Sequence, residues 1–114
     1  FACFVEQDSE ARGALEHNLR RVPTTAQKII PGDARDMSAY KNLGPFDLVF
    51  MDPPYGEAII TGLLAQLGTA NILRHGGILV AESDAKEPIF EDVPGFTFLE
   101  SRRYGRNCLH YYSA

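Results

Sequence analysis

Apolar residues along the chain fall into two alternating patterns. Short unbroken runs in "FACFVE", "AQKII" and "FDLVFMD" predict three buried strands. Between and after these runs, apolar residues recur at helical spacing and predict two amphipathic helices. The first helical face comprises Ala11, Leu15, Asn18, Leu19 and Val22, and the second comprises Ile60, Leu63, Leu64 and Leu67. Asp8 or Ser9 can cap the first helix, and Pro23 ends it.

The last third of the chain has a different pattern. "RHGGILVAES" predicts a glycine turn followed by a fourth buried strand, with Ser83 and Asp84 in the loop after it. "FTFLESRRY" and "NCLHYYS", separated by Gly105-Arg106, predict an antiparallel hairpin. Strands alternating with helices indicate an α/β fold with a mostly parallel sheet. The unbroken run from Leu48 to Met51 predicts a strand covered on both faces.

Length and composition fit one small globular domain. The chain has 114 residues, of which 45% are hydrophobic. It contains neither an apolar run of bilayer length nor a secretory signal pattern, so a cytoplasmic location is expected. Cys3 and Cys108 are far apart and are predicted to be buried thiols. The three histidines (His17, His75 and His110) share no metal or catalytic spacing, so we expect them at the surface or in satisfied hydrogen bonds.

The overall charge argues against a surface that coats nucleic-acid phosphates broadly, because the formal net charge is −4. Locally the balance differs, since "SRRYGRN" places Arg102, Arg103 and Arg106 around Tyr104. Such a cluster can bind phosphates, but small groups of arginines are also common on ordinary solvated surfaces.

Acidic residues follow each of the first three predicted strands. These are Glu6, Asp33 and Asp52. Each could be a helix cap or a turn residue. Ligands of open α/β sheets, however, bind beyond the carboxyl ends of the strands, so all three are predicted to face one cleft. There Glu6 can accept hydrogen bonds from a ribose diol. Asp33 can accept from an adenine amino group, and the Ala34 N–H can donate to a ring nitrogen.

The loop Asp52-Pro53-Pro54-Tyr55 is the most specific motif. Its two prolines have no N–H, so the local carbonyl oxygens are left to a ligand. The Asp52 carboxylate and the neighbouring carbonyl form a double acceptor suited to an exocyclic NH2 group. Tyr55 adds a ring on which a planar base can stack. The alternative is a proline turn with Tyr55 in the core.

These residues resemble those of a known family. "VFMDPPYGEA" resembles motif IV of the amino-methyltransferases, and "RHGGILVAE" resembles the glycine strand of class I S-adenosylmethionine-dependent methyltransferases. The order of motifs over the whole chain is similar to the RsmD type, which methylates the exocyclic N2 of a guanine in 16S rRNA. The resemblance implies a Rossmann-like class I methyltransferase sheet, with residues 1–114 as a single partial domain.

The resemblance also implies roles for individual residues. S-adenosyl-L-methionine would be the cofactor, 16S rRNA or the small ribosomal subunit the partner, and neither a metal nor a membrane would be involved. The implied catalytic residues are Asp52, Pro53 and Tyr55; the cofactor-binding residues are Glu6, Asp33, Ala34 and Asp52; and the substrate-binding residues are Pro54, Tyr55 and Glu82. Asp52 and the Pro53 carbonyl would hold the target amine while Tyr55 stacks on the flipped base.

One part of the family pattern is absent. The chain opens inside a strand, and the first strand with its glycine-rich cofactor loop is not found; Gly76-Gly77 lies in the wrong place. In the class I order 3-2-1-4-5-7-6 that strand is central, so we expect two separate sub-sheets. The chain would then be a fragment of a longer enzyme, or another chain or a rearranged pairing would fill the position. We expect it alone to bind cofactor poorly and to be inactive.

Two alternatives remain open. An adenine-N6 methyltransferase acting on DNA or RNA uses a close variant of the motif around Asp52. A truncated Rossmann-like module that binds a nucleotide or RNA without catalysis would explain the missing glycine loop.

Overall fold

The computed structural model describes residues 1–22, 26–54, 59–87 and 91–114. The chain divides into two compact units, residues 1–42 and 43–114, which are described separately below. None of the helices in the described ranges is long and apolar enough to span a membrane.

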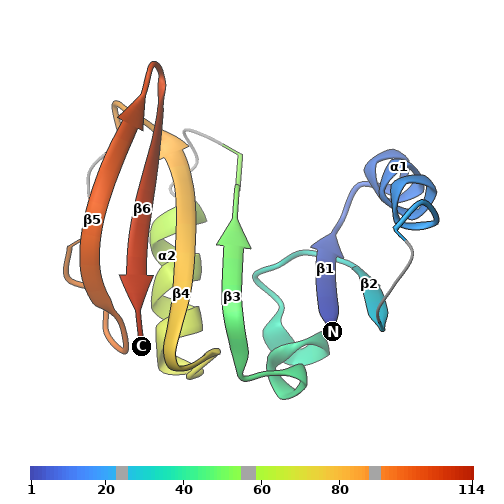
Figure 1. The fold of residues 1–114 in the computed structure, drawn as a ribbon, viewed down its shortest axis with the longest axis horizontal. Helices are drawn as coiled ribbons and strands as arrows, with labels where there is room; N and C mark the ends of the chain where they lie inside the picture. The colour runs from blue at the N-terminus through green and yellow to red at the C-terminus, as the bar shows by residue number, and fades with distance from the viewer. Residues whose placement is uncertain (23–25, 55–58, 88–90) are drawn as a thin grey trace. The chain divides into compact units, whose positions relative to one another are not determined.

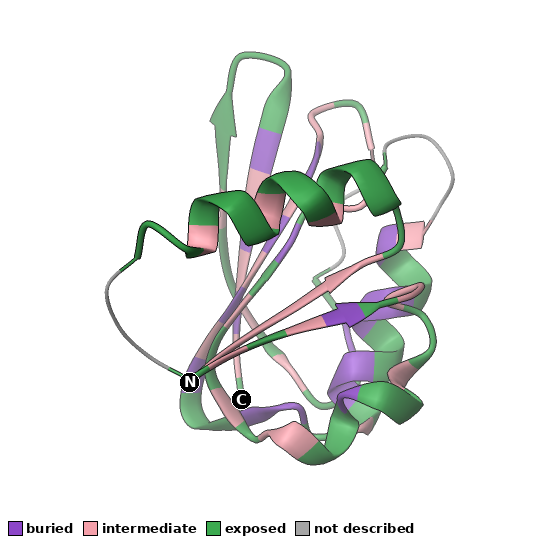
Figure 2. Cartoon of the chain, turned by 90° about the vertical axis from the view of Figure 1, so that its right-hand side faces the viewer, coloured by how far each residue is buried: buried purple, intermediate pink, exposed green. Residues whose placement is uncertain are grey.

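The first unit is a strand–helix–strand motif. β1 (Ala2–Glu6) pairs in parallel with β2 (Gln27–Pro31), and α1 (Ser9–Leu19) connects them. The Asp8 carboxylate caps α1 by accepting the Ala11 N–H at 2.8 Å, which confirms one of the two predicted caps. None of the α1 side chains is buried (Figure 2), and the helix ends at Leu19, before Val22. Two short 3₁₀ turns follow β2, at Met37–Ala39 (η1) and Lys41–Leu43 (η2).

The second unit is a four-stranded sheet with one helix. Its elements are β3 (Phe46–Met51), α2 (Ile59–Thr69), β4 (Leu73–Asp84), β5 (Thr97–Tyr104) and β6 (Asn107–Ser113). The strand order is β3-β4-β6-β5, with β3 and β4 parallel and the other pairs antiparallel (Figure 1).

This topology tests the expected organisation. The described strands form a two-stranded and a four-stranded sheet, which confirms the prediction of two sub-sheets. The predicted antiparallel hairpin is confirmed as β5 and β6. The placement of Ser83 and Asp84 in a loop is wrong, because β4 continues through both residues and pairs with β6 up to Asn107.

The core of the second unit lies between α2 and one face of the sheet. All four apolar residues of the predicted helical face are buried, with Leu64 wholly inaccessible. Leu79 and Ala81 of β4 and Tyr112 of β6 are also wholly inaccessible, and the strand register puts them on one face of the sheet. α2 therefore buries its apolar stripe against alternate residues of the central strands, which is the source of this unit's hydrophobic stability.

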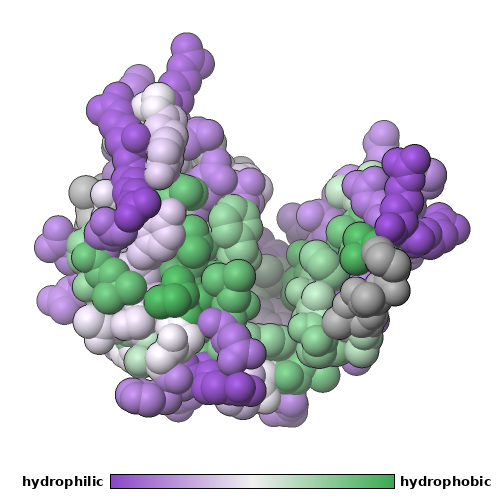
Figure 3. All heavy atoms as spheres, viewed as in Figure 1, coloured by the Kyte–Doolittle hydropathy of each residue, from purple (hydrophilic) through white to green (hydrophobic). Residues whose placement is uncertain are grey.

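The opposite face of the sheet is apolar but exposed. Leu48 and Phe50 of β3 are 64% and 61% exposed, and the register places them beside Ile78 and Val80 of β4. Apolar side chains gather over this part of the sheet in Figure 3. The prediction that β3 is covered on both faces is thus wrong for the described residues, because the side chains of Leu48 and Phe50 are exposed.

A buried histidine links three strands of this sheet. His110 of β6 is 1% exposed, and its Nε2 lies 2.7 Å from Ser83 Oγ of β4. Its Nδ1 lies 2.6 Å from Ser101 Oγ of β5. Both ring nitrogens are hydrogen-bonded, which confirms for His110 the expectation of a satisfied histidine.

We predict that His110 makes the stability of this sheet depend on pH. Burial lowers the pKa of His110 from 6.5, opposed by the charge of Glu87, so the folded state disfavours the imidazolium. The stability that neutral His110 contributes is complete above the pKa of His110 in the unfolded state. It is lost as the pH falls below that value. Urea unfolding at about pH 7.5 and about pH 5 should show a smaller loss of stability in His110→Gln than in the unmutated protein.

The matched control for this experiment is His17→Gln, which changes an exposed histidine on α1. It should keep the pH dependence of the unmutated protein. An unchanged pH dependence in His110→Gln would show that His110 is not the group responsible.

Candidate active site

In the first unit, two predicted cofactor positions lie at neighbouring strand ends. The parallel register sets Glu6 of β1 against Pro31 of β2, and the Gly32 N–H donates to the Glu6 carbonyl at 3.2 Å. Gly32 has φ +143°, a backbone conformation that side-chain-bearing residues rarely adopt. Glycine therefore allows the chain to turn here and deliver Asp33 and Ala34 beside the end of β1.

The Glu6 carboxylate is partly engaged by the start of α1. Its Oε1 accepts the Asp8 N–H at 3.0 Å. The Arg12 guanidinium donates to the main-chain carbonyls of Glu6 and Gln7 at 3.1 and 2.7 Å, which fixes the strand–helix junction. Within the described residues Oε2 accepts no hydrogen bond, so this oxygen can receive the hydroxyls of a ribose.

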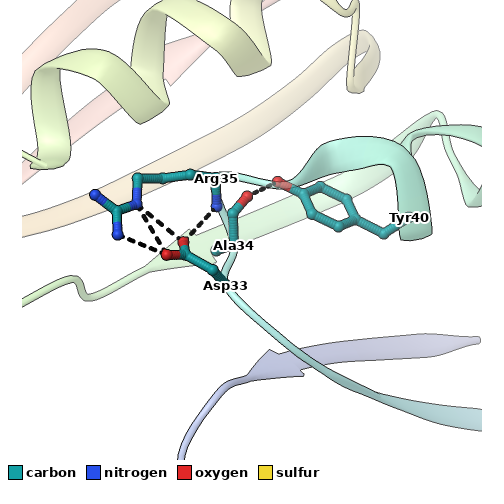
Figure 4. A network of polar contacts seen from close by, with 4 residues as sticks. All are labelled: Asp33, Ala34, Arg35 and Tyr40. Carbon is teal, nitrogen blue, oxygen red and sulfur yellow. Dashed lines mark hydrogen bonds and ion pairs between the residues drawn. The ribbon is translucent and has the colours of Figure 1, made fainter.

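The Asp33 carboxylate is paired with Arg35, a residue that the sequence reasoning did not consider (Figure 4). Arg35 Nη2 lies 2.6 Å from Asp33 Oδ2, and Arg35 Nε lies 3.0 Å from both carboxylate oxygens. The Arg35 backbone N–H also donates to Oδ1 at 2.9 Å. These bonds lower the pKa of Asp33 to about 2, so it is a carboxylate at neutral pH. Since Arg35 occupies both oxygens, Arg35 has to shift before Asp33 can accept from an adenine amino group.

Tyr40 is a second residue that sequence reasoning missed. It is 7% exposed, and its hydroxyl donates to the Ala34 carbonyl oxygen (Figure 4). Burial, followed by the charges of Asp33 and Asp36, raises the pKa of Tyr40 to about 12, which keeps the hydroxyl protonated as a donor. Tyr40 thus anchors the turn whose Ala34 N–H is the predicted donor to a purine ring.

In the second unit, two carboxylates share the carboxyl edge of the sheet. β3 and β4 are parallel, and Met51 pairs with Ala81, so the next residues in register are Asp52 and Glu82. Asp52 is exposed as a residue, but partial burial of its carboxyl group, followed by the charge of Glu82, raises its pKa. Asp52 is therefore a more basic acceptor than an isolated aspartate, and it lies where the sequence predicted a ligand edge.

The rest of the loop is described as far as Pro54. Pro53 is half-buried and Pro54 is exposed. Neither has an N–H, so the end of β3 presents the Asp52 carboxylate and main-chain oxygens without competing backbone donors. Tyr55 lies outside the described residues, and its predicted stacking role remains a prediction.

A groove of about 400 Å³ in the first unit lies away from these positions. It is lined by Glu16, Leu19, Arg20, Gln27 and Ile29. These residues come from the end of α1 and from β2 before its carboxyl end. The groove is therefore separate from the turn that carries Asp33 and Ala34.

The family of the chain follows from its sequence as a whole. Residues 1–113 match the model of the family described as "Conserved hypothetical protein 95". The chain belongs to this family, which is the RsmD family that its motifs resemble.

Individual relatives agree with this assignment. A Bacillus subtilis (strain 168) protein named "Putative rRNA methyltransferase YlbH" is 29% identical over 105 residues, covering 90% of this chain. The chain spans 57% of the length of that relative.

Two solved structures share the Rossmann-like α/β fold. A conserved hypothetical protein from Streptococcus pyogenes has a TM-score of 0.83 at 22% identity, covering 97% of this chain and 69% of its own. An rRNA methylase from Streptococcus thermophilus has a TM-score of 0.70 at 14% identity, covering 97% of this chain and 71% of its own. At these identities the likeness establishes the fold.

We predict that Glu82 sets the basicity of Asp52. Glu82→Gln removes the neighbouring negative charge but preserves shape, so the pKa of Asp52 should fall. Carbon-detected NMR titration of the Asp52 carboxyl group measures this change directly.

The control is Asp47→Asn, which removes a carboxylate near the other end of β3, where Asp47 pairs with Arg74 at 3.1 Å. It should leave the titration of Asp52 unchanged. An Asp52 pKa that does not respond to Glu82→Gln would show that the two carboxylates are not coupled.

Proposed function

We propose that this chain forms the amine-holding and adenosine-binding parts of an S-adenosyl-L-methionine-dependent methyltransferase that acts on the exocyclic N2 of a guanine in 16S rRNA. One observation carries the proposal: Asp52 and two prolines without an N–H directly follow β3, next to Glu82 of β4, in a chain of the RsmD family. The proposed setting is cytoplasmic, with the small ribosomal subunit as the partner.

The end of β3 has the chemistry to hold an amine. An exocyclic NH2 group has two N–H donors and needs two acceptors at fixed positions. The Asp52 carboxylate accepts one of these hydrogens, and the Pro53 carbonyl accepts the other. Held in this way, the amine lone pair turns out of conjugation with the ring and becomes nucleophilic, which is catalysis by positioning.

Asp52 also handles the charge that develops on the amine. When the nitrogen gains a methyl group it becomes cationic, and a nearby carboxylate stabilises it and accepts its proton. The raised pKa of Asp52 suits this role, since a more basic carboxylate is a better proton acceptor. Tyr55 and Pro54 would contact the flipped base, with Glu82 lining its pocket.

The first unit supplies acceptors and a donor that fit an adenosine group. S-adenosyl-L-methionine, when bound, supplies an electrophilic methyl group on a sulfonium. The free oxygen of the Glu6 carboxylate would accept from the ribose hydroxyls, and the Ala34 N–H would donate to the adenine ring. Asp33 would accept from the adenine amino group once Arg35 has moved away.

Ribosomal RNA is proposed as the substrate because of the names of two similar proteins. The names of the Bacillus subtilis and Streptococcus thermophilus proteins describe rRNA methylation.

The decisive test is methyl transfer by the full-length protein. Small ribosomal subunits and DNA are each incubated with methyl-labelled S-adenosyl-L-methionine, and the modified base is identified. Label in N2-methylguanine of 16S rRNA is expected. Label in N6-methyladenine would favour the adenine-specific alternative, and binding of S-adenosylhomocysteine without any transfer would favour the non-catalytic module.

We predict that Asp52→Ala separates catalysis from cofactor binding. Loss of the amine acceptor should lower kcat by roughly 10²-fold or more. Affinity for S-adenosylhomocysteine, measured by calorimetry, should stay within a few-fold of the unmutated value, since adenosine is held by residues of β1 and β2. The control Asp47→Ala should keep both properties, and loss of both in Asp52→Ala would contradict the assigned roles.

A further inference from the structure

The end of the β5–β6 hairpin concentrates positive charge. The last pair of the hairpin is Tyr104 with Asn107, and the turn contains Gly105 at φ +63°. Arg102, Arg103, Tyr104 and Arg106 are all exposed; these four residues are called the arginine hairpin end below. Hydrophilic side chains gather at this end of the second unit in Figure 3, in a chain whose net charge is −4.

The strand registers place the arginine hairpin end on the same edge as Asp52. Glu82 of β4 pairs with Leu109 of β6, which pairs with Arg102 of β5. Arg102 and Tyr104 therefore lie on the face of Glu82, whereas Arg103, whose partner Cys108 pairs with Ser83, lies on the other face. Arg102 and Glu82 are in one row across the sheet. Neighbouring strands are about 4.8 Å apart, so the Cα atoms of Arg102 and Asp52, three strand spacings apart, are separated by about 14 Å. In Figure 1 the hairpin extends past the ends of β3 and β4.

Charge along this edge divides into two parts. The acidic residues Asp52, Glu82 and Asp84 belong to the ends of β3 and β4, whereas the arginines belong to β5 and the turn. Acceptors for an amine and donors for phosphates thus lie on one edge, separated by the width of β6. A nucleic-acid strand carries both chemistries, an amine on a base and negative charge on its phosphates.

Two of the three arginines have guanidinium groups available to a ligand. Arg102 is held by Glu100, with Nη2 2.8 Å from Oε1, and lies 5.6 Å over the ring of Tyr111. Arg103 Nε donates to the Gly105 carbonyl at 3.0 Å, which leaves its two terminal nitrogens. Among the described residues neither Arg103 nor Arg106 forms an ion pair.

Tyr104 adds an exposed aromatic ring to the same place. It is 56% exposed, although it ends a regular strand. Guanidinium groups beside an exposed ring are the combination that binds single-stranded nucleic acid, through phosphates and base stacking.

We propose that the arginine hairpin end binds RNA next to the target nucleotide. Tyr104 stacks on a flanking base, Arg106 of the turn contacts a phosphate, and Arg103 contacts a further phosphate from the other face of the same edge. This surface rests on the proposed function, since the acidic part of the edge is assigned to the target amine. It extends that function by giving the enzyme a binding site for the flanking strand.

The test compares matched variants of the full-length protein. Binding of a fluorescein-labelled single-stranded RNA of about 20 nucleotides is measured by anisotropy at several salt concentrations. Arg103→Ala with Arg106→Ala should weaken binding about tenfold and reduce the slope of log affinity against log salt by about 1.4. Arg20→Ala with Arg21→Ala makes the same change in charge on the first unit and should bind as the unmutated protein does.

Tyrosine variants test the stacking separately. Tyr104→Ala should weaken binding about fivefold or more, whereas Tyr104→Phe should restore it because the ring is kept. In methyl transfer to ribosomal RNA, the arginine variant should raise KM and leave kcat nearly unchanged, because these residues are remote from the amine.

The outcomes separate this proposal from the proposed function. If the unmutated protein methylates RNA while the arginine variant binds and methylates equally well, the hairpin surface is refuted and the enzyme stands. If no protein transfers methyl groups but the arginine variant alone loses RNA affinity, the enzyme is refuted and the surface stands. The proposed RNA-binding surface would also be refuted if the Arg20 and Arg21 control lost as much RNA affinity as the arginine variant. It would likewise be refuted if the arginine variant lost affinity for an acidic peptide but not for RNA.

Discussion

The parallel register that pairs Met51 with Ala81 determines the chemistry of the second unit. It brings Asp52 and Glu82 to adjacent positions on one edge, and their mutual repulsion helps to raise the pKa of Asp52. The register is held by Met51 of β3 and by Leu79 and Ala81 of β4, which are buried and which a shift of one residue would expose. Hydrophobic packing on one face thus places the charges at the end of the sheet.

The strand pairing of the same sheet also fixes the position of the hairpin relative to Asp52 and Glu82. Pairing of β4 with β6 and of β6 with β5 continues the row from Glu82 to Arg102. His110 is hydrogen-bonded to Ser83 and Ser101 on the two flanking strands, so the interior of the sheet is tied together near this edge. The acidic and basic parts of the edge therefore belong to one continuous sheet.

Helix α2 and the β5–β6 hairpin could be predicted from the sequence because each is specified by a pattern of residues close together in the chain. The helical spacing of Ile60, Leu63, Leu64 and Leu67 predicted α2, and the hairpin was predicted from its two runs and their turn. The pairing of Asp33 with Arg35 has only a weak local signal, a spacing of two residues. The anchoring of Ala34 by Tyr40 and the exposure of Phe50 depend on packing between elements, which periodicity within one element does not specify.

We propose that the edge at Asp52 holds a guanine amine of 16S rRNA for methylation. Its most direct test is mass spectrometry of nucleosides from 16S rRNA of cells that lack the protein. One N2-methylguanosine should disappear in these cells and should return with the unmutated gene, but not with Asp52→Ala. An unchanged set of methylated guanosines, or the loss of an N6-methyladenosine instead, would contradict it.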